Sequence, residues 1–124
     1  MIVRPYQSTD RAELNKLLEA RGTAAGRLPK RGFVVTDGPE AAAFGFLRKV
    51  EGGYMLFDSL ISNPKLNSEQ RNMAMELLWT TVIAASKGKT LLGFTKDNGT
   101  LQRALKAGFA PEAYTVLVYK GPKA

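Results

Sequence analysis

An apolar, strand-like stretch that passes through a proline loop directly into a long helix constrains this chain more than any other feature. Residues 54–62 carry β-favouring apolar side chains, Asn63-Pro64 interrupts them, and a helical pattern extends from about Ser68 to Ser86. This order points the N-terminus of a helix at the end of a buried strand. Because the first helical amides lack intrahelical partners and lie at the positive end of the helix dipole, the junction is a candidate site for a phosphate-bearing ligand.

The other predicted elements alternate along a single domain of residues 1–124. Strands are expected over residues 1–4, 33–36, 42–50, 54–62, 90–95 and 113–119, and further helices are expected before Gly22 and over residues 100–107, the latter after a turn at Asn98-Gly99. The order β-α-β-β-β-α-β-α-β indicates an α+β fold with a mixed β-sheet. The fourth and fifth strands should be parallel because a helix connects them.

The first helix carries the clearest signals for its start and its buried side. Asp10 and Glu13 have the spacing of a capping box. Leu14, Leu17 and Leu18 recur at helical spacing. We therefore expect a helix that begins near Asp10 and packs these leucines against the sheet.

Composition excludes several classes of chemistry. The chain has no cysteine and no histidine, so it lacks the atoms for a Ser-His-Asp or Cys-His nucleophile, a zinc site built on these residues, or a disulfide framework. General acid–base catalysis would therefore have to use Asp, Glu, Tyr, Lys or a bound water. No basic and apolar leader and no long apolar run occur, so we expect a cytoplasmic protein without a membrane partner.

The charge balance favours an anionic partner. There are 18 Lys and Arg residues against 11 Asp and Glu residues, a net charge of +7. Only Arg21, Arg27, Lys30 and Arg31 gather locally, and no aromatic side chains alternate with them as on a base-stacking surface. A nucleic-acid-binding module thus rests on net charge alone, and we expect no nucleic acid as partner.

With its strand–proline–helix junction, Asn98, the pair Gly108-Phe109 and the opening residues 3–10, nearly the whole chain resembles the GCN5-related N-acetyltransferase (GNAT) family. The resemblance implies helices on both faces of the sheet and acetyl-CoA as co-substrate, bound where the fourth and fifth strands splay apart. It assigns the cofactor-binding backbone of the fourth strand to Leu60, Ile61 and Ser62. The pyrophosphate loop falls on Gln70, Arg71, Asn72, Met73 and Ala74, and Asn98 is assigned a further cofactor contact.

This chain departs from the family pattern at several of these positions. Glu69 stands where a Gln or Arg is usual, and Asn72 stands where a Gly is usual, whereas Ala74 matches. Where the family often carries a tyrosine that protonates the departing thiolate, this chain has Ala104 or Leu105. The pyrophosphate loop is therefore degenerate. Ser68 and Glu69 are equally explained as residues that favour a helix start.

The resemblance predicts an acyl-CoA-dependent N-acetyltransferase in which a small-molecule or protein amine attacks the thioester directly. Asp58 is the candidate catalytic base, because a mid-strand carboxylate on the same face as Leu56 and Leu60 is unexpected unless the strand opens onto a cleft. Asp58 is explained equally well as a structural carboxylate that pairs with an arginine, or as a solvent-exposed carboxylate at the end of a strand. Glu69 is the second candidate for the base.

Another class of function also accounts for the sequence. A non-catalytic protein that keeps this fold in a structural or interaction role, as small phage internal virion proteins resembling the family do, would explain the degenerate loop and the missing tyrosine. The retained strand–proline–helix junction and Asn98 favour the enzyme instead. The sequence leaves the acceptor amine and a homodimer open.

Overall fold

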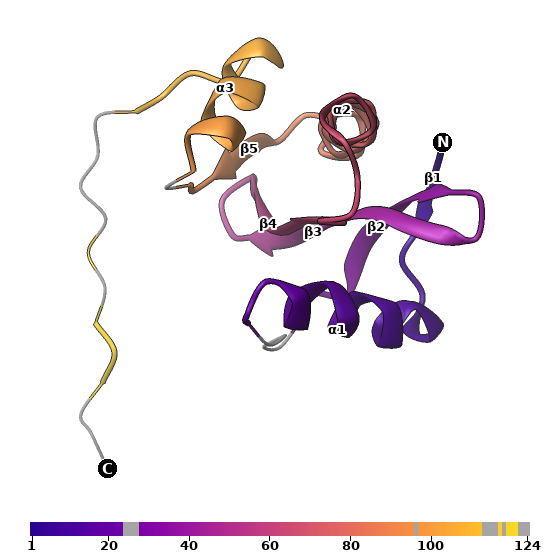
Figure 1. The fold of residues 1–124 in the computed structure, drawn as a ribbon. Coiled ribbons are helices and arrows are strands. Elements are labelled where there is room, and N and C mark those ends of the chain that lie inside the picture. The colour runs from indigo at the N-terminus through magenta and orange to yellow at the C-terminus, as the bar shows by residue number, and fades with distance from the viewer. Residues whose placement is uncertain (24–27, 96, 113–116, 118, 122–124) are drawn as a thin grey trace.

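The described residues of the computed structural model, which are 1–23, 28–95, 97–112, 117 and 119–121, form a five-stranded sheet with its strands in chain order (Figure 1). Its strands are β1 (Ile2–Pro5), β2 (Arg31–Asp37), β3 (Glu40–Val50), β4 (Tyr54–Ser62) and β5 (Thr90–Gly93). Neighbouring strands pair antiparallel except β4 and β5, which are parallel. The predicted mixed sheet is thus confirmed, including the parallel pair that a helix connects.

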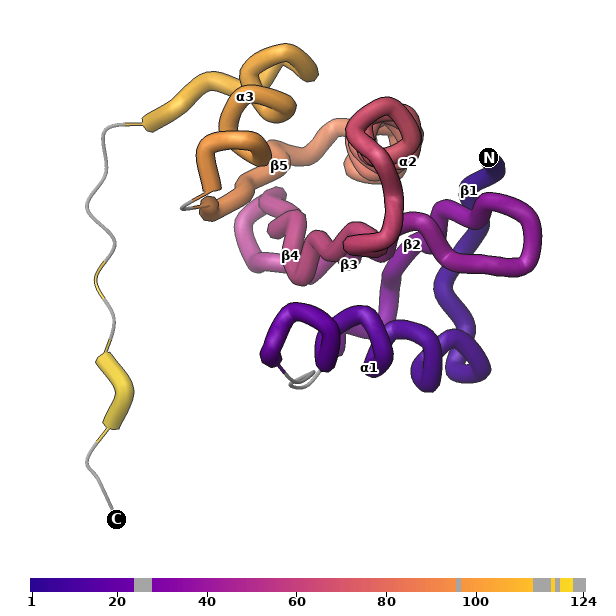
Figure 2. The backbone as a smooth tube through the Cα atoms, viewed as in Figure 1, coloured from indigo at the N-terminus to yellow at the C-terminus, as the bar shows by residue number. Residues whose placement is uncertain are grey.

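Helices cover both faces of this sheet. The short 3-10 helix η1 (Ser8–Asp10) and α1 (Arg11–Ala20) lie on one face, and α2 (Ser68–Ala85) and α3 (Asn98–Lys106) lie on the other, as the ribbon and the backbone tube both show (Figures 1 and 2). The predicted α+β architecture with helices on both faces is confirmed. None of the described helices is long and apolar enough to cross a bilayer.

Each face of the sheet has its own apolar core. On the α1 side, the three predicted leucines of the helix stripe pack with side chains of the sheet in a cluster of Leu14, Leu17, Leu18, Val34, Ala41, Phe44, Phe46 and Ile61. On the α2 side, Leu78, Trp79 and Val82 pack with side chains that include Leu47, Met55 and Phe57. Burial of a large apolar side chain contributes about 1.5 to 3 kcal/mol relative to exposure, so these two cores hold both layers on the sheet.

The predicted helix start near Asp10 is confirmed, since α1 begins at Arg11, but the predicted capping box between Asp10 and Glu13 was wrong. Asp10 forms the capping box with Gln7, whose backbone N–H donates to Asp10 Oδ2 at 2.8 Å. Glu13 instead accepts a hydrogen bond from the backbone N–H of Ala41 on β3, at 2.6 Å. The Glu13 carboxylate, which local spacing assigned to the helix cap, therefore binds the backbone of β3 instead.

Two element boundaries at the C-terminal end also differ from the prediction. Asp97 caps α3 by accepting a hydrogen bond from the backbone N–H of Thr100, so the helix includes Asn98 and Gly99, which were expected to form a turn. β5 ends at Gly93 rather than Thr95. The strand expected over residues 113–119 falls largely on residues outside those described.

A bulge in β4 changes which side chains share a face. Asp58 pairs with Phe46 and Ile61 pairs with Phe44, so the two residues between them on β4 oppose only Gly45 on β3. Ser59, at the start of this bulge, has a φ of 54°, the left-handed region that favours glycine. Because the bulge breaks the alternation, Ile61 and not Leu60 shares the face of Asp58, which corrects the predicted face.

Candidate functional site

The strands β4 and β5 separate part of the way along the sheet. Their parallel pairing runs from Tyr54 and Thr90 to Phe57 and Gly93, where β5 ends, while β4 continues to Ser62. The bulge at Ser59 bends β4 at the point where the pairing stops. The backbone of β4 beyond Phe57 is thus not paired with β5.

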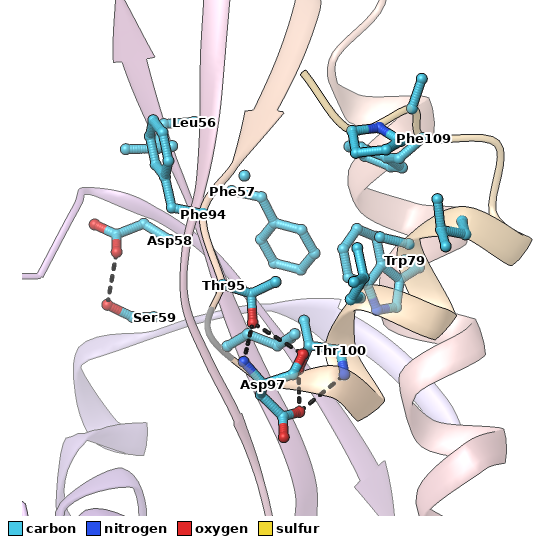
Figure 3. Close-up of a pocket in the computed structure, with 17 residues that line it drawn as sticks. Leu56, Phe57, Asp58, Ser59, Trp79, Phe94, Thr95, Asp97, Thr100 and Phe109 are labelled. Carbon is cyan, nitrogen blue, oxygen red and sulfur yellow. Dashed lines mark hydrogen bonds between the residues drawn. The ribbon is translucent and has the colours of Figure 1, made fainter. Parts of the chain in front are cut away.

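A cleft of about 380 Å³ lies at this separation, between β4, the end of β5 and α3 (Figure 3). Phe57 and Asp58 project to opposite sides of β4, and both of them line the cleft. The cleft therefore passes between the two strands from one face of the sheet to the other. Its further lining comes from α2 and from the segment of β5, α3 and the residues after it: Trp79, Gly93, Phe94, Thr95, Asp97, Thr100, Leu101, Ala104, Leu105, Phe109, Ala110 and Pro111.

Three aromatic rings form one wall of the cleft. Trp79 of α2 contacts Phe57 edge to face with 4.7 Å between ring centroids, and contacts Phe109 in the same way at 5.1 Å (Figure 3). Trp79 is 6% exposed, and its indole N–H is buried without a hydrogen-bond partner in the structure. The wall suits the apolar methylene groups of an extended ligand arm.

The other end of the cleft is polar. The carboxylate of Asp97 accepts hydrogen bonds from the hydroxyl and the backbone N–H of Thr100, both at 2.8 Å, and these bonds lower the pKa of Asp97 (Figure 3). Thr95 Oγ1 accepts from the backbone N–H of Asp97 at 3.0 Å. These bonds fix the first turn of α3 against the end of β5.

Asp58 lies at the face of the cleft away from α2. Its Oδ2 accepts hydrogen bonds from Nε and Nη2 of Arg48 on β3 at 3.3 and 3.2 Å, and its Oδ1 accepts from the Ser59 hydroxyl at 3.4 Å. The Asp58 side chain remains 34% exposed. Asp58 is thus both the arginine-paired carboxylate and the cleft carboxylate that the sequence left as alternatives.

The three assigned backbone residues of β4 have different environments. Leu60 lines the cleft, whereas Ile61 packs in the core on the α1 side. The carbonyl and the hydroxyl of Ser62 both accept hydrogen bonds from Arg21 at 2.9 Å, which ties the end of α1 to the end of β4. The strand backbone of Leu60 is therefore the most accessible of the three to a ligand in the cleft.

A capping box engages two backbone amides at the N-terminus of α2, those of Asn67 and Gln70. Asn67 Oδ1 accepts from the backbone N–H of Gln70 at 2.8 Å, and Gln70 Oε1 accepts from that of Asn67 at 3.1 Å. The backbone N–H of Arg71 donates to the Asn67 carbonyl, and the amides that follow lie within the helix. The degenerate loop thus does not present the cradle of free amides that the resemblance assigned to residues 70–74.

The side chains at these positions serve mainly the protein. Arg71 donates to the Leu66 carbonyl at 3.2 Å, Asn72 Oδ1 accepts from Nη2 of Arg103 at 3.1 Å, and Ala74 is fully buried. Met73 is 49% exposed. Asn72 is thus linked by a hydrogen bond to Arg103 of the neighbouring helix α3.

Sequence reasoning missed the residues that α3 and Trp79 bring to the cleft. Asn98 is exposed at the first position of α3, and its neighbour Asp97 lines the cleft instead. The pattern Asp97-x-x-Thr100 is a helix-capping signal that marks this turn. No local pattern connects Trp79 with Phe57 and Phe109, because these residues meet only through the packing of separate elements.

Comparison with known proteins gives a match in structure and none in sequence. No protein-family model and no curated protein matches the chain. TTHA1254 from Thermus thermophilus matches with a TM-score of 0.68 and 20% identity over 99% of this chain and 100% of that one. The GNAT family acetyltransferase SP0256 from Streptococcus pneumoniae TIGR4 matches with a TM-score of 0.70 and 9% identity over 97% and 98%.

A ligand-bound structure is among these matches. The aminoglycoside N-acetyltransferase AAC(6')-Iy, in complex with CoA, matches with a TM-score of 0.66 and 16% identity over 98% of this chain and 100% of that one. The chain therefore has the fold of the GNAT acetyltransferases. At these identities, the likeness establishes the fold and leaves substrate and mechanism to the residues of this chain.

Proposed function

We propose that the protein is an acyl-CoA-dependent N-acetyltransferase that transfers an acetyl group to an amine. The single observation that carries this proposal is the parting of β4 from β5, with a cleft of about 380 Å³ that passes through the sheet. A cleft with an unpaired strand edge on one side suits an amide-bearing arm that adds as a short extra strand. The aromatic wall at Trp79 supplies apolar contact along the same path.

The residues of the cleft fit the arm of CoA better than its phosphates. The β4 backbone near Leu60 can hydrogen-bond to amides, and the lining is largely apolar. At the N-terminus of α2, by contrast, the capping box of Asn67 and Gln70 already uses the Gln70 amide, one of the first-turn amides that could bind a phosphate. A bound acyl-CoA supplies an activated thioester carbonyl, whose C–S bond breaks as the amine nitrogen bonds to the carbonyl carbon.

Two groups of the chain have roles in this reaction. A backbone N–H near Leu60 or Ile61 would donate a hydrogen bond to the thioester carbonyl oxygen, where negative charge develops in the transition state. The carboxylate of Asp58 would accept the proton of the attacking ammonium, whose pKa in solution is near 10, directly or through a water. The cleft holds the two reactants together, which lowers the entropic cost of their encounter.

Among the residues that the structure describes, we assign no acid to the leaving thiolate. Ala104 and Leu105 line the cleft at the positions where the family often has a tyrosine. A thiol with an ordinary pKa near 8.5 is a tolerable leaving group at neutral pH. We therefore expect slow turnover that rises with pH as the amine loses its proton.

Ligand-dependent stability tests the binding half of the proposal. Acetyl-CoA at about a hundred times its dissociation constant should stabilise the native state by about 2.7 kcal/mol, because only the folded chain has the cleft. Differential scanning fluorimetry with and without acetyl-CoA measures this as a higher Tm. An unchanged Tm up to millimolar acetyl-CoA would remove the support for a coenzyme site.

Replacement of Asp58 tests the catalytic half. In a panel of amines, Asp58→Asn should lower kcat about a hundredfold while the affinity for acetyl-CoA stays the same, because general-base catalysis contributes about 10² to 10⁴. Asp37→Asn, at the exposed end of β2, is the matched control. Equal turnover in all three proteins would assign Asp58 to its ion pair with Arg48 alone.

A second function is favoured by one specific observation. The capping box at Asn67 and Gln70 and the apolar Ala104 and Leu105 together suit a protein that keeps the GNAT fold in a structural or interaction role without acetyl transfer. Release of free CoA thiol in the amine panel distinguishes the two functions. Binding of acetyl-CoA without thiol release from any amine would favour the second.

A further inference from the structure

The cleft has an opening on the face of the sheet away from α2. Side chains alternate along β4, so Leu56 and Asp58 project to this face while Phe57 projects toward α2. Phe94, which directly follows β5, also lines the cleft and lies on the same side as Leu56 and Asp58 (Figure 3). We refer to this part of the cleft, lined by Leu56, Asp58 and Phe94, as the outer opening.

The helix α1 shares this face of the sheet but packs elsewhere on it. Its leucines contact β2, β3 and, on β4, Ile61 near the end of the strand. The three residues of the outer opening are outside that core: Leu56 and Asp58 are half-buried, and Phe94 is 70% exposed. The outer opening is therefore accessible to a molecule that approaches from solvent.

An arginine and a carboxylate lie side by side at the outer opening. Arg48 is opposite Leu56 in the pairing of β3 with β4, which places its side chain on the same face and diagonal to Asp58. Its Nε and Nη2 both donate to Asp58 Oδ2, at 3.3 and 3.2 Å. The side chains of Arg48 and Asp58 are 45% and 34% exposed. A ligand at this opening therefore meets a cation and an anion at once.

The short distance between these two charges restricts the ligand that can contact both. Such a ligand needs an ammonium group for Asp58 and an anion for Arg48 on neighbouring atoms. A free α-amino acid has this arrangement, because one carbon separates its ammonium and its carboxylate, and arginine binds carboxylates through charge-assisted hydrogen bonds. The N-terminus of a peptide and the side chain of a lysine both lack the adjacent carboxylate.

The remaining lining of the outer opening is apolar. Leu56 and the exposed ring of Phe94 flank the charged pair on β4 and after β5 (Figure 3). An aromatic ring in contact with a ligand excludes water from a large apolar area. This lining suits an amino acid with an apolar side chain better than glycine or a charged amino acid.

We infer that the acceptor amine is a free α-amino acid with an apolar side chain, with its ammonium at Asp58, its carboxylate at Arg48 and its side chain against Phe94. This inference rests on the proposed function and names its substrate class. The nitrogen bonds to the acetyl carbon as the C–S bond breaks, and the products are an N-acetyl amino acid and CoA thiol. Of the two protons that the nitrogen loses, one passes through Asp58 to solvent and the other ends on the thiolate. Arg48 takes no part in these bond changes and determines specificity.

A pair of acceptors that differ in one group tests the role of Arg48. Phenylalanine and phenylalaninamide, in which a neutral amide replaces the carboxylate, are compared by release of CoA thiol from acetyl-CoA. We expect Arg48→Gln to lower kcat/KM for phenylalanine about tenfold or more, mainly through KM, and to change it less than about twofold for phenylalaninamide. Each substrate is compared between variant and unmodified chain, so the different amine pKa values of the two acceptors cancel.

Three further variants make the test specific to the outer opening. Lys49→Gln removes the same charge from the next residue of β3, which is exposed and projects to the α2 face, and should leave both acceptors unchanged. Arg48→Lys should restore part of the activity toward phenylalanine. Phe94→Ala should reduce the preference for phenylalanine over glycine about tenfold, because the apolar contact is lost. Thermal melting of each variant checks that it folds.

The outcomes separate this inference from the function on which it rests. A loss with Arg48→Gln that is confined to phenylalanine supports the inference. If amines are acetylated but Arg48→Gln affects both acceptors alike, the amino-acid assignment is wrong and the proposed function stands. Equal turnover of phenylalanine and of a peptide with an N-terminal phenylalanine would also overturn the assignment, in favour of a peptide acceptor. Absence of thiol release with every acceptor would overturn both.

Discussion

At the scale of single residues, Asp10 shows how one buried carboxylate connects two elements. Its oxygens accept hydrogen bonds from both terminal nitrogens of Arg4 on β1, at 2.6 and 2.8 Å, and from the backbone N–H of Gln7. The hydrogen bonds from Arg4 hold the pKa of Asp10 below its usual range, and Asp10 raises the pKa of Arg4. The carboxylate therefore stabilises the fold in its charged form.

We predict that Asp10→Asn lowers the free energy of unfolding at pH 7 by about 1 to 2 kcal/mol, the lower part of the range for charged hydrogen bonds because Arg4 is partly exposed. Since the pKa of Asp10 is lower in the folded than in the unfolded chain, its contribution is complete well above the unfolded value near 3.9. It is lost as the pH falls through the folded pKa.

Urea unfolding of the Asp10→Asn variant from pH 7 to pH 2 measures this effect. The difference from the unmodified chain should begin to shrink below about pH 4, where Asp10 takes up a proton in the unfolded chain, and should vanish only below the lower pKa of Asp10 in the folded chain. Asp37→Asn, with an exposed carboxylate, is the control. A difference that stays constant over the whole range would contradict an electrostatic role for Asp10.

At the scale of elements, the bulge in β4 and the glycine that faces it shape the cleft. A Cβ atom on Gly45 would lie 2.7 Å from the Phe57 ring and 3.1 Å from the side chain of Leu78. Gly45 opposes the bulge at Ser59, so the absence of a side chain lets α2 and Phe57 approach β3. The aromatic wall of the cleft depends on this close approach.

Gly45→Ala should therefore destabilise the protein by about 1 to 3 kcal/mol, the usual cost of extra volume in a packed core. Phe57 must shift to admit the methyl group, and the shift should also weaken acetyl-CoA binding. For stability alone, Gly93→Ala is the matched control, because a Cβ there meets no atom within 4 Å; Gly93 lines the cleft, so it is not a control for ligand binding. Equal urea midpoints for the two variants would show that the core at Phe57 yields freely.

The capping box of α2 leads to a prediction about this helix alone. Asn67→Ala removes the side chain that accepts from the Gln70 amide and should cost about 1 kcal/mol of stability. Asn98→Ala is a matched control, since Asp97 caps α3 and Asn98 follows the cap. Thermal melting of the two variants should separate them by several degrees, and coincident melts would show that the cap contributes little.

At the scale of the whole molecule, the two sides of β4 differ in how firmly they are packed. The strands β2 to β4 contribute buried residues to the two cores, whereas no residue of β5 or α3 is buried. The α3 helix borders the cleft, and a second hollow lies between it and α2. Few buried apolar contacts correspond to a low free energy of local opening.

Amide hydrogen exchange should therefore be at least tenfold faster in α3 than in the buried turns of α2 around Leu78 and Val82. Acetyl-CoA should slow exchange in α3 more than in α1, since α3 borders the cleft and α1 does not line it. Exchange measured by mass spectrometry, with and without ligand, tests this expectation. Similar protection of α2 and α3 in the free protein would contradict it.

The element order and the buried face of α1 could be predicted from local patterns, whereas α2 buries Ala74, Met75, Leu78, Trp79 and Val82, a face that helical spacing alone did not identify. Leu14, Leu17 and Leu18 mark the face of α1, and the residues of β4 mark a strand with the predicted bounds, because alternation and helical spacing are properties of neighbouring residues. The parallel pairing of β4 with β5 also followed from their helical connection. These features depend on short stretches of chain.

The site itself depends on contacts between distant stretches, which local patterns do not contain. The bulge at Ser59 follows from the packing around Gly45, Glu13 binds the sheet instead of its own helix start, and Arg103 meets Asn72 across two helices. A side chain takes the partner with the lowest free energy in the folded chain, and that partner is often remote in sequence. Local sequence patterns thus predicted the strand and the helix that flank the cleft. Packing between elements determined the walls, the charges and the depth of the cleft.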